Sequence, residues 1–220
     1  MLINNCEFAE DVLYDLTHDV WVKPRGDTIT VGLNPYMAWL AGRVTTVRFK
    51  PVGSHVERGS VMGSYEGPKY FGVVRSPVDG EIVKVNQTLT SNPRLLQNDP
   101  YREGWFAEIM PTKPKSYAEY LVGLEKAKTH FEKRVSELRA HCYKAVPDHE
   151  IFAFGVECSA VLAQLNEYLE KAPLGTVVHV ASDEPTADIE IVRWAKQTGQ
   201  QLLEKRVEGG AHHYLVKKVV

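Results

Sequence analysis

Residues 65–80, which read YEGPKYFGVVRSPVDG, constrain the fold more than any other stretch of the chain. Turn and strand signals alternate there: a turn at Gly67-Pro68-Lys69, a strand over residues 70–74, a second turn over residues 76–80 and a further strand over residues 81–86. The pattern predicts a β-hairpin with Lys69 at its tip, away from the core. In most chains such a lysine is a solvated residue that resists edge pairing, so the hairpin by itself does not assign a function.

Composition and charge exclude several classes of protein. The chain has 220 residues, of which 44% are hydrophobic and 25% charged, as in ordinary globular proteins. The formal net charge of −2 and the lack of a basic stripe argue against nucleic-acid binding. No apolar run approaches the roughly 18 residues of a membrane span, and the acidic first 16 residues do not have the architecture of a signal peptide. A cytoplasmic protein without a membrane partner is expected.

The cysteines and histidines give little support for a metal site. Cys6, Cys142 and Cys158 are odd in number and far apart, without CxxC spacing. This argues against a disulfide framework and against a thiolate zinc site, and it fits a reducing compartment. His212 and His213 are adjacent in a predicted strand, where neighbouring side chains point to opposite faces. A structural role is expected for both histidines.

Three segments follow one another along the chain. Residues 14–111 are rich in short strands separated by turn signals, with a helix expected at about residues 34–41, which indicates a small barrel or sandwich within a domain of residues 1–112. The PTKPKS sequence at 111–116 marks a break. Apolar residues then recur at helical spacing over 117–142, which predicts an amphipathic helix of about seven turns in a linker of residues 113–147.

The last segment, residues 148–220, predicts a second domain. Strands are expected at 150–154 and 176–181, helices at 159–172 and 188–198, and a hairpin over 201–207 and 212–219. Asp183 is a candidate N-cap for the second helix and Gly199 a candidate C-cap. The order βαβαββ indicates a two-layer α+β domain, joined to the first by the long helix.

The first domain resembles the glycine cleavage system H protein. The matches run over about residues 14–111 and include His18, Trp21-Val22, Gly26–Gly32, Val52-Gly53, Val56–Gly59, Glu66–Lys69, Ser76–Val83, Asn98–Tyr101 and Gly104-Trp105. The resemblance implies a flattened β-barrel of the barrel-sandwich hybrid type. It also implies lipoic acid attached covalently to Lys69, with Glu66 recognised by the lipoate-attaching enzyme. Pro68 and Tyr70 stand where biotin carriers place methionines, which disfavours biotin.

The second domain resembles the TusA/SirA-type sulfur carriers. The matches are Gly155, Cys158, Val178–Pro185, Asp188-Ile189, Trp194, Thr198-Gly199, Leu202–Glu204 and Tyr214–Lys218. Cys158 lies just before a predicted helix, whose free N–H groups and partial positive charge would lower the pKa of its thiol. The family follows this cysteine with Pro-x-Pro, whereas here Ser159-Ala160-Val161 follows. A persulfide site at Cys158 and a cysteine that only packs between helix and sheet therefore both stay open.

The two resemblances imply a lipoyl carrier fused to a sulfur-carrier-like domain. One role is glycine cleavage, in which the lipoyl arm serves the glycine cleavage enzymes and a dihydrolipoyl dehydrogenase reoxidises it. A second role is in sulfur metabolism, where the arm carries a sulfur-bound intermediate between enzymes and Cys158 exchanges sulfur. A different class is a sulfurtransferase that uses Cys158 as nucleophile on an unmodified N-terminal scaffold. A binding module with neither site active is the remaining alternative.

Overall fold

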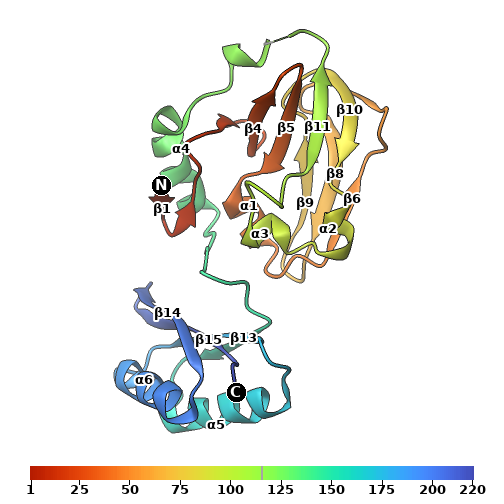
Figure 1. Ribbon diagram of the computed structural model, residues 1–220. Coiled ribbons are helices and arrows are strands. Elements are labelled where there is room, and N and C mark those ends of the chain that lie inside the picture. Colours follow the sequence, from red (N-terminus) through yellow and green to blue (C-terminus); the bar gives the residue numbers. More distant parts are fainter. Residues whose placement is uncertain (115) are drawn as a thin grey trace. The chain divides into compact units, whose positions relative to one another are not determined.

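The computed structural model describes residues 1–114 and 116–220, which form two compact units, Met1–Cys142 (unit 1) and Tyr143–Val220 (unit 2) (Figure 1). Lys115, which belongs to the predicted break at 111–116, lies outside the described residues. Among the described residues, no helix is both long and apolar enough to cross a bilayer.

Unit 1 is built mainly from short strands. Their bounds are β1 Leu2–Ile3, β2 Cys6–Glu7, β3 Leu13–Asp15, β4 Val20–Arg25, β5 Thr28–Leu33, β6 Thr46–Phe49, β7 His55–Val56, β8 Val61–Glu66, β9 Phe71–Arg75, β10 Gly80–Val85 and β11 Ala107–Pro111. The helices are α1 Pro35–Leu40, α2 Thr88–Ser91, α3 Leu95–Asn98, the 3-10 turn Ser116–Glu119 and α4 Leu124–Glu137. Helix α1 confirms the helix expected at residues 34–41.

The strands of unit 1 form a sheet of six in the order β3-β4-β5-β11-β10-β7, a sheet of three in the order β6-β8-β9, and the β1-β2 pair. Figure 1 shows β4, β5, β11 and β10 side by side in that order. Phe49 from the smaller sheet packs on Phe106, which precedes β11, with ring centroids 4.7 Å apart. Among the described residues no ladder joins the two sheets, so the β-rich architecture holds while a closed barrel is not formed.

The predicted helix over residues 117–142 is shorter in the structure. The α-helix spans only Leu124–Glu137. Before it, the N–H of Val122 donates to the carbonyl of Tyr14 at 3.1 Å, and the carbonyl of Val122 accepts from the N–H of Tyr14 at 2.8 Å, which holds Val122 in an extended bridge. After the helix, Arg139 has a φ of 50°, which helix geometry does not allow. The pairing of Val122 thus limits the helix at its start, and the left-handed Arg139 limits it at its end, although the apolar periodicity continues beyond both.

Helix α4 contributes to the core of unit 1. Phe131 is fully buried, stacks on Phe8 with centroids 4.3 Å apart and meets Tyr14 edge-on at 4.9 Å. On the same helix, Arg134 donates to Asp19 at 3.0 Å. Because aromatic residues account for much of the energy of a core, α4 acts as part of unit 1 rather than only as a connection.

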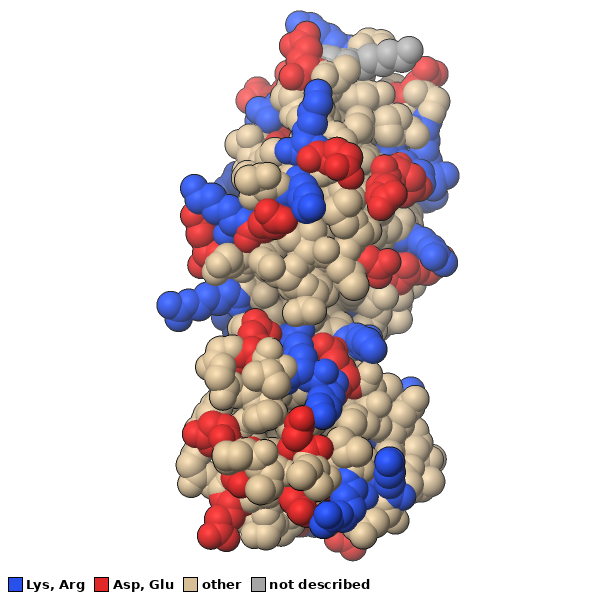
Figure 2. Space-filling model, turned by 90° about the vertical axis from the view of Figure 1, so that its left-hand side faces the viewer, with Lys and Arg blue, Asp and Glu red and all other residues tan. Residues whose placement is uncertain are grey.

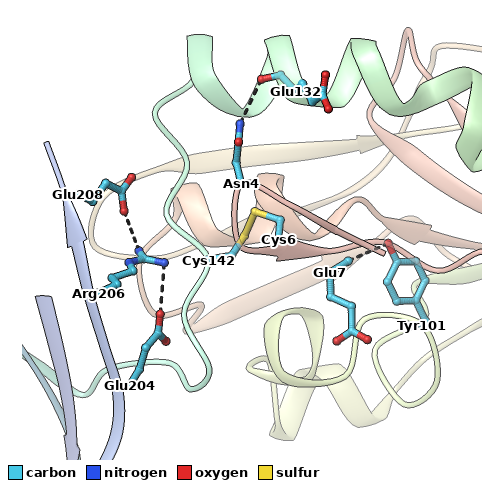
Figure 3. The surroundings of a disulfide bond; sticks show 9 residues. All are labelled: Asn4, Cys6, Glu7, Tyr101, Glu132, Cys142, Glu204, Arg206 and Glu208. Atoms are coloured by element: carbon cyan, nitrogen blue, oxygen red, sulfur yellow. Dashed lines mark hydrogen bonds and ion pairs between the residues drawn. A yellow bond between two sulfur atoms is a disulfide. The ribbon is translucent and has the colours of Figure 1, made fainter.

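A disulfide joins Cys6 of β2 to Cys142, the last residue of unit 1 (Figure 3). The expectation that the chain forms no disulfide is therefore wrong. The two cysteines are 136 residues apart, a separation that sequence spacing does not connect. They meet because the N-terminal strand pair lies against α4, where the side chain of Asn4 donates to the carbonyl of Glu132 at 3.3 Å. Cys158 is the free cysteine among the described residues, and it is buried.

Unit 2 has the predicted order of elements. These are β12 His149–Ala153, α5 Cys158–Lys171, β13 Val177–Ser182, α6 Ala187–Thr198, β14 Gln201–Glu208 and β15 Ala211–Lys217. The sheet order is β12-β13-β15-β14, with β12 parallel to β13 and the other pairs antiparallel. Residues of α5 and α6 share one apolar core with the sheet, which makes the two-layer α+β arrangement.

Candidate functional site

Lys69 lies at the tip of the β8-β9 hairpin. The last paired residues are Glu66 and Phe71, and the turn between them is closed by the N–H of Gly67, which donates to the carbonyl of Tyr70 at 3.1 Å. Lys69 is exposed, as are the aromatic side chains of Tyr70 and Phe71 that follow it. Strand pairing thus places a primary amine on a short, well-defined turn at the surface.

The loop after α1 supports this turn from below. The N–H of Lys69 donates to the carbonyl of Ala41 at 3.2 Å. A Cβ added to Gly67 would lie 2.2 Å from the same oxygen, so the turn touches the loop there and only glycine fits. The methylenes of Lys69 lie over Gly42, whose φ of 69° turns the loop under them: a Cβ on Gly42 would lie 3.2 Å from Cδ of Lys69.

The backbone of Glu66 joins two strands, whereas its side chain lies at the surface. Its carbonyl accepts from the N–H of Thr45 at 2.8 Å and from the Thr45 hydroxyl at 3.2 Å. These bonds tie the end of β8 to the start of β6. The residue itself is exposed, so its carboxylate is available to a partner beside the hairpin tip.

The residues that support the hairpin have no recognisable pattern in the sequence. The loop from Ala41 to Val44 carries no motif, and Gln97 lies next to the matched Asn98 without standing out. The structure brings the amide of Gln97 against this loop. Gln97 stands out only by being a polar residue that is buried on a short helix, and burial is not visible in the sequence.

Cys158 is the first residue of α5. A helix start should lower the pKa of this thiol, but the surroundings of Cys158 raise it. Burial is the largest cause, followed by the carboxylates of Glu184 and Glu190. The expectation of a lowered pKa is therefore wrong. The electrostatic benefit of a helix N-terminus is of order 1 kcal/mol and falls off within a turn, whereas burial and two nearby anions both disfavour a thiolate.

The loop that follows β13 also differs from expectation in one detail. Asp183 does not cap α6, because the N-cap position is Thr186. Instead, the carboxylate of Asp183 accepts from the N–H of Gly155 at 2.8 Å and so holds the turn before α5. Gly199 ends α6 in the left-handed conformation with φ 73°, as the sequence predicts.

The two adjacent histidines of β15 point to opposite faces of the sheet. His212 lies 3.3 Å from Asp188 of α6. His213 instead stacks on His179 with a nitrogen–nitrogen distance of 3.0 Å, and burial followed by the charge of His179 lowers its pKa. In the part of the chain that the structure describes, no group of three or more His, Cys, Asp or Glu residues has the arrangement of a metal site.

Charged side chains of both signs are mixed on the face of the molecule drawn in Figure 2, where Lys and Arg lie among Asp and Glu. In unit 2, for example, Arg206 lies between Glu204 and Glu208, at 3.3 and 3.2 Å (Figure 3). Such mixing on this face fits the formal net charge of −2.

Comparison with known proteins divides the chain in the same order. The glycine cleavage H-protein family model matches residues 12–134, and the sulfurtransferase TusA family model matches residues 150–218. Glycine cleavage system H protein 5 of Aquifex aeolicus is 36% identical over 144 residues, which cover 64% of this chain and 97% of that protein. A probable glycine cleavage system H protein 2 of Sulfurisphaera tokodaii is 36% identical over 124 residues, 55% of this chain and 84% of that protein.

A solved structure, that of a glycine cleavage system H protein from Mycobacterium marinum, matches with a TM-score of 0.49 and 23% identity over 58% of this chain and 98% of that one. Glycine cleavage H proteins carry a lipoate attached covalently to a lysine. The family match begins one residue before the start of β3 and runs into α4, so it takes in the Lys69 hairpin, the loop beneath it and the helix that completes the core. The chain belongs to the glycine cleavage H-protein family, with a TusA-like domain at its C-terminal end.

Proposed function

We propose that this protein is a lipoyl carrier in which Lys69 bears the lipoyl group. The observation that carries the proposal is an exposed lysine at the tip of a hairpin that a neighbouring loop braces through the Ala41 carbonyl. Family membership supports it, since glycine cleavage H proteins carry lipoate on a lysine. The residues fit the group. Lys69 is exposed, so its side-chain amine can form the amide bond, and the hydrogen bond to Ala41 holds the turn while the side chain and its arm move.

The protein's own residues present the amine rather than perform chemistry. Bound lipoate supplies a dithiolane that partner enzymes reduce, load or oxidise. Lys69 anchors the arm, and amide formation removes the positive charge of its side chain. Glu66, exposed at the base of the turn, is a recognition point for the lipoate-attaching enzyme. Loss of its charge should weaken that enzyme's binding without moving the hairpin.

Sulfur metabolism is the role that the fused domain favours over glycine cleavage. A domain that matches the TusA model follows the carrier unit in the same chain, which fits an arm that carries a sulfur-bound intermediate. In glycine cleavage the same arm would serve the glycine cleavage enzymes, with reoxidation by a dihydrolipoyl dehydrogenase. The hairpin itself serves both roles equally well.

A sulfurtransferase that works through Cys158 is the second candidate. The match to the TusA model favours it, whereas the raised pKa of the buried thiol disfavours it, because the thiolate is the reactive form. In this candidate Cys158 gains a persulfide and Lys69 stays unmodified. In the lipoyl-carrier proposal, by contrast, the C-terminal domain can bind a sulfur-handling partner without a reactive thiol.

Mass spectrometry of the protein purified from its native host tests the proposal. We expect a lipoyl adduct that peptide mapping places on Lys69. Lys69→Arg should abolish it, and the matched change Lys50→Arg, at another exposed lysine of the same unit, should not. An unmodified Lys69 in cells whose other lipoyl proteins are modified would refute the carrier function.

The cargo is tested on the lipoylated protein. Incubation with a persulfide donor should transfer the donor's outer sulfur to a thiol of the reduced arm, as the S–S bond of the donor breaks and the donor leaves as its thiol. Lys69→Arg should lose that adduct, while Cys158→Ser should keep it. Loading by a glycine decarboxylase with glycine, and no sulfur adduct on the arm, would assign the protein to glycine cleavage. Sulfur on Cys158 in the Lys69→Arg variant would support the sulfurtransferase.

A further inference from the structure

Gln97 of α3 bridges the two ends of the loop beneath the Lys69 turn. Its side-chain oxygen accepts from the backbone N–H of Val44 at 3.0 Å, and its side-chain nitrogen donates to the carbonyl of Gly42. Both contacts join residues more than 50 positions apart in the chain. One buried amide thus fixes the path of the loop between Gly42 and Val44.

This loop is what the hairpin tip rests on. Ala41 accepts the N–H of Lys69, Gly67 touches the carbonyls of Ala41 and Arg43, and Gly42 lies under the methylenes of Lys69. A shift of the loop therefore reaches the turn through direct contacts. Gln97 is thus linked to Lys69 through one intervening segment.

Loss of the Gln97 amide would leave the buried N–H of Val44 without its acceptor. Val44 is buried, and its N–H has no other acceptor described. An unsatisfied buried N–H costs about 1–3 kcal/mol, so the loop would move to regain hydrogen bonds from water. The Lys69 turn, which contacts this loop, would then adopt other backbone conformations, which the lipoate-attaching enzyme binds less well.

We propose that Gln97 is a positioning residue that sets how Lys69 is presented to the enzyme that acylates it. The inference rests on the proposed lipoylation of Lys69. If only a fraction of molecules hold the competent turn, the apparent affinity falls by that fraction while turnover of the bound protein is unchanged. The effect of Gln97 should therefore appear in KM and not in kcat.

Asn86 offers a matched control within the same unit. Gln97 and Asn86 are both 5% exposed. Asn86 also bridges backbone groups, donating to the carbonyls of Glu103 and Trp105 at 2.7 and 2.8 Å. Its removal should cost similar stability, but the loop it holds is not the one under Lys69.

The experiment measures acylation of the unmodified full chain by a lipoate–protein ligase with lipoate and ATP, over a range of carrier concentrations. For Gln97→Met, which keeps the length and loses both hydrogen bonds, we expect KM to rise about tenfold with kcat within twofold. For Asn86→Leu we expect both constants within twofold of the unaltered protein. Should Gln97→Met not fold, Gln97→Glu keeps the acceptor for Val44 but loses the donor to the Gly42 carbonyl, so KM should rise by less than the tenfold expected for Gln97→Met.

Amide hydrogen exchange gives a readout that does not depend on lipoylation. Exchange at Gly67 and Lys69 should speed up in Gln97→Met and stay unchanged in Asn86→Leu. Equal KM values for the two variants, or unchanged exchange at both amides, would overturn the role of Gln97. If the unaltered protein is not acylated on Lys69, the lipoyl-carrier proposal fails, while the exchange data still decide whether Gln97 holds the turn.

Discussion

Removal of the Cys6–Cys142 disulfide should destabilise unit 1 strongly. The bond closes a loop whose ends are 136 residues apart, almost the full length of the unit. A cross-link lowers the entropy of the unfolded chain, and the chain-entropy relation gives about 5 kcal/mol at 25 °C for a loop of this size. Native domains are stable by about 5–15 kcal/mol in total, so the bond accounts for a large share of that stability.

Calorimetry of the oxidised protein, the reduced protein and the Cys6→Ser/Cys142→Ser variant measures the loss. For a domain of this size, a change of about 5 kcal/mol corresponds to a fall in melting temperature of roughly 10–20 °C. Reduction of the unaltered protein should lower the melting temperature of unit 1, whereas reductant should not affect the double variant. The reductant comparison matters because both cysteines are buried, and serine hydroxyls there add a cost of their own.

Thiol labelling in denaturant shows whether the Cys6–Cys142 disulfide is formed or reduced in each sample. The oxidised protein should label on Cys158 alone, and the reduced protein on its three cysteines. If the oxidised and reduced proteins unfold within about 1 kcal/mol of each other after this check, the chain-entropy argument is refuted. Residual structure that already holds the two ends together in the unfolded chain would then be the physical cause.

Three further predictions concern single contacts and the unit boundaries. Alkylation of Cys158 in the oxidised protein should have a pH midpoint above that of the same cysteine in denaturant, because burial and the nearby Glu184 raise its pKa; a lower midpoint would restore the persulfide-carrier interpretation. Lys218→Met should destabilise unit 2 by about 1–3 kcal/mol in urea melts, since its Nζ donates to the carbonyls that end α5 at 2.6 and 2.8 Å, and Lys217→Met is the control with the same charge change. A fragment of residues 1–142 should give dispersed amide NMR signals and a fragment of residues 1–112 should not, because the shorter one lacks Phe131; two equally dispersed spectra would support the boundary at residue 112 instead.

The sequence alone determined the local elements of this protein. The turn residues around Lys69 and the β-branched runs beside them predict the hairpin, because turn chemistry and strand period act between neighbouring residues. The same local rules place the six elements of unit 2 and end α6 at Gly199, which adopts the left-handed conformation found there. The spaced motifs along the chain also resemble those of two known families, and this resemblance identified the families of unit 1 and unit 2.

Only the tertiary structure decided the contacts between distant segments. Cys6 meets Cys142, and Gln97 reaches Gly42 and Val44, through the packing of elements that have no mutual signal in their local sequence. The pKa of Cys158 was predicted in the wrong direction for the same reason: the helix start is visible in the sequence, whereas the burial and the carboxylates that outweigh it are not. Periodicity likewise extended α4 into residues that pair with β3, because a pattern within one segment does not reveal the partner that competes for its backbone.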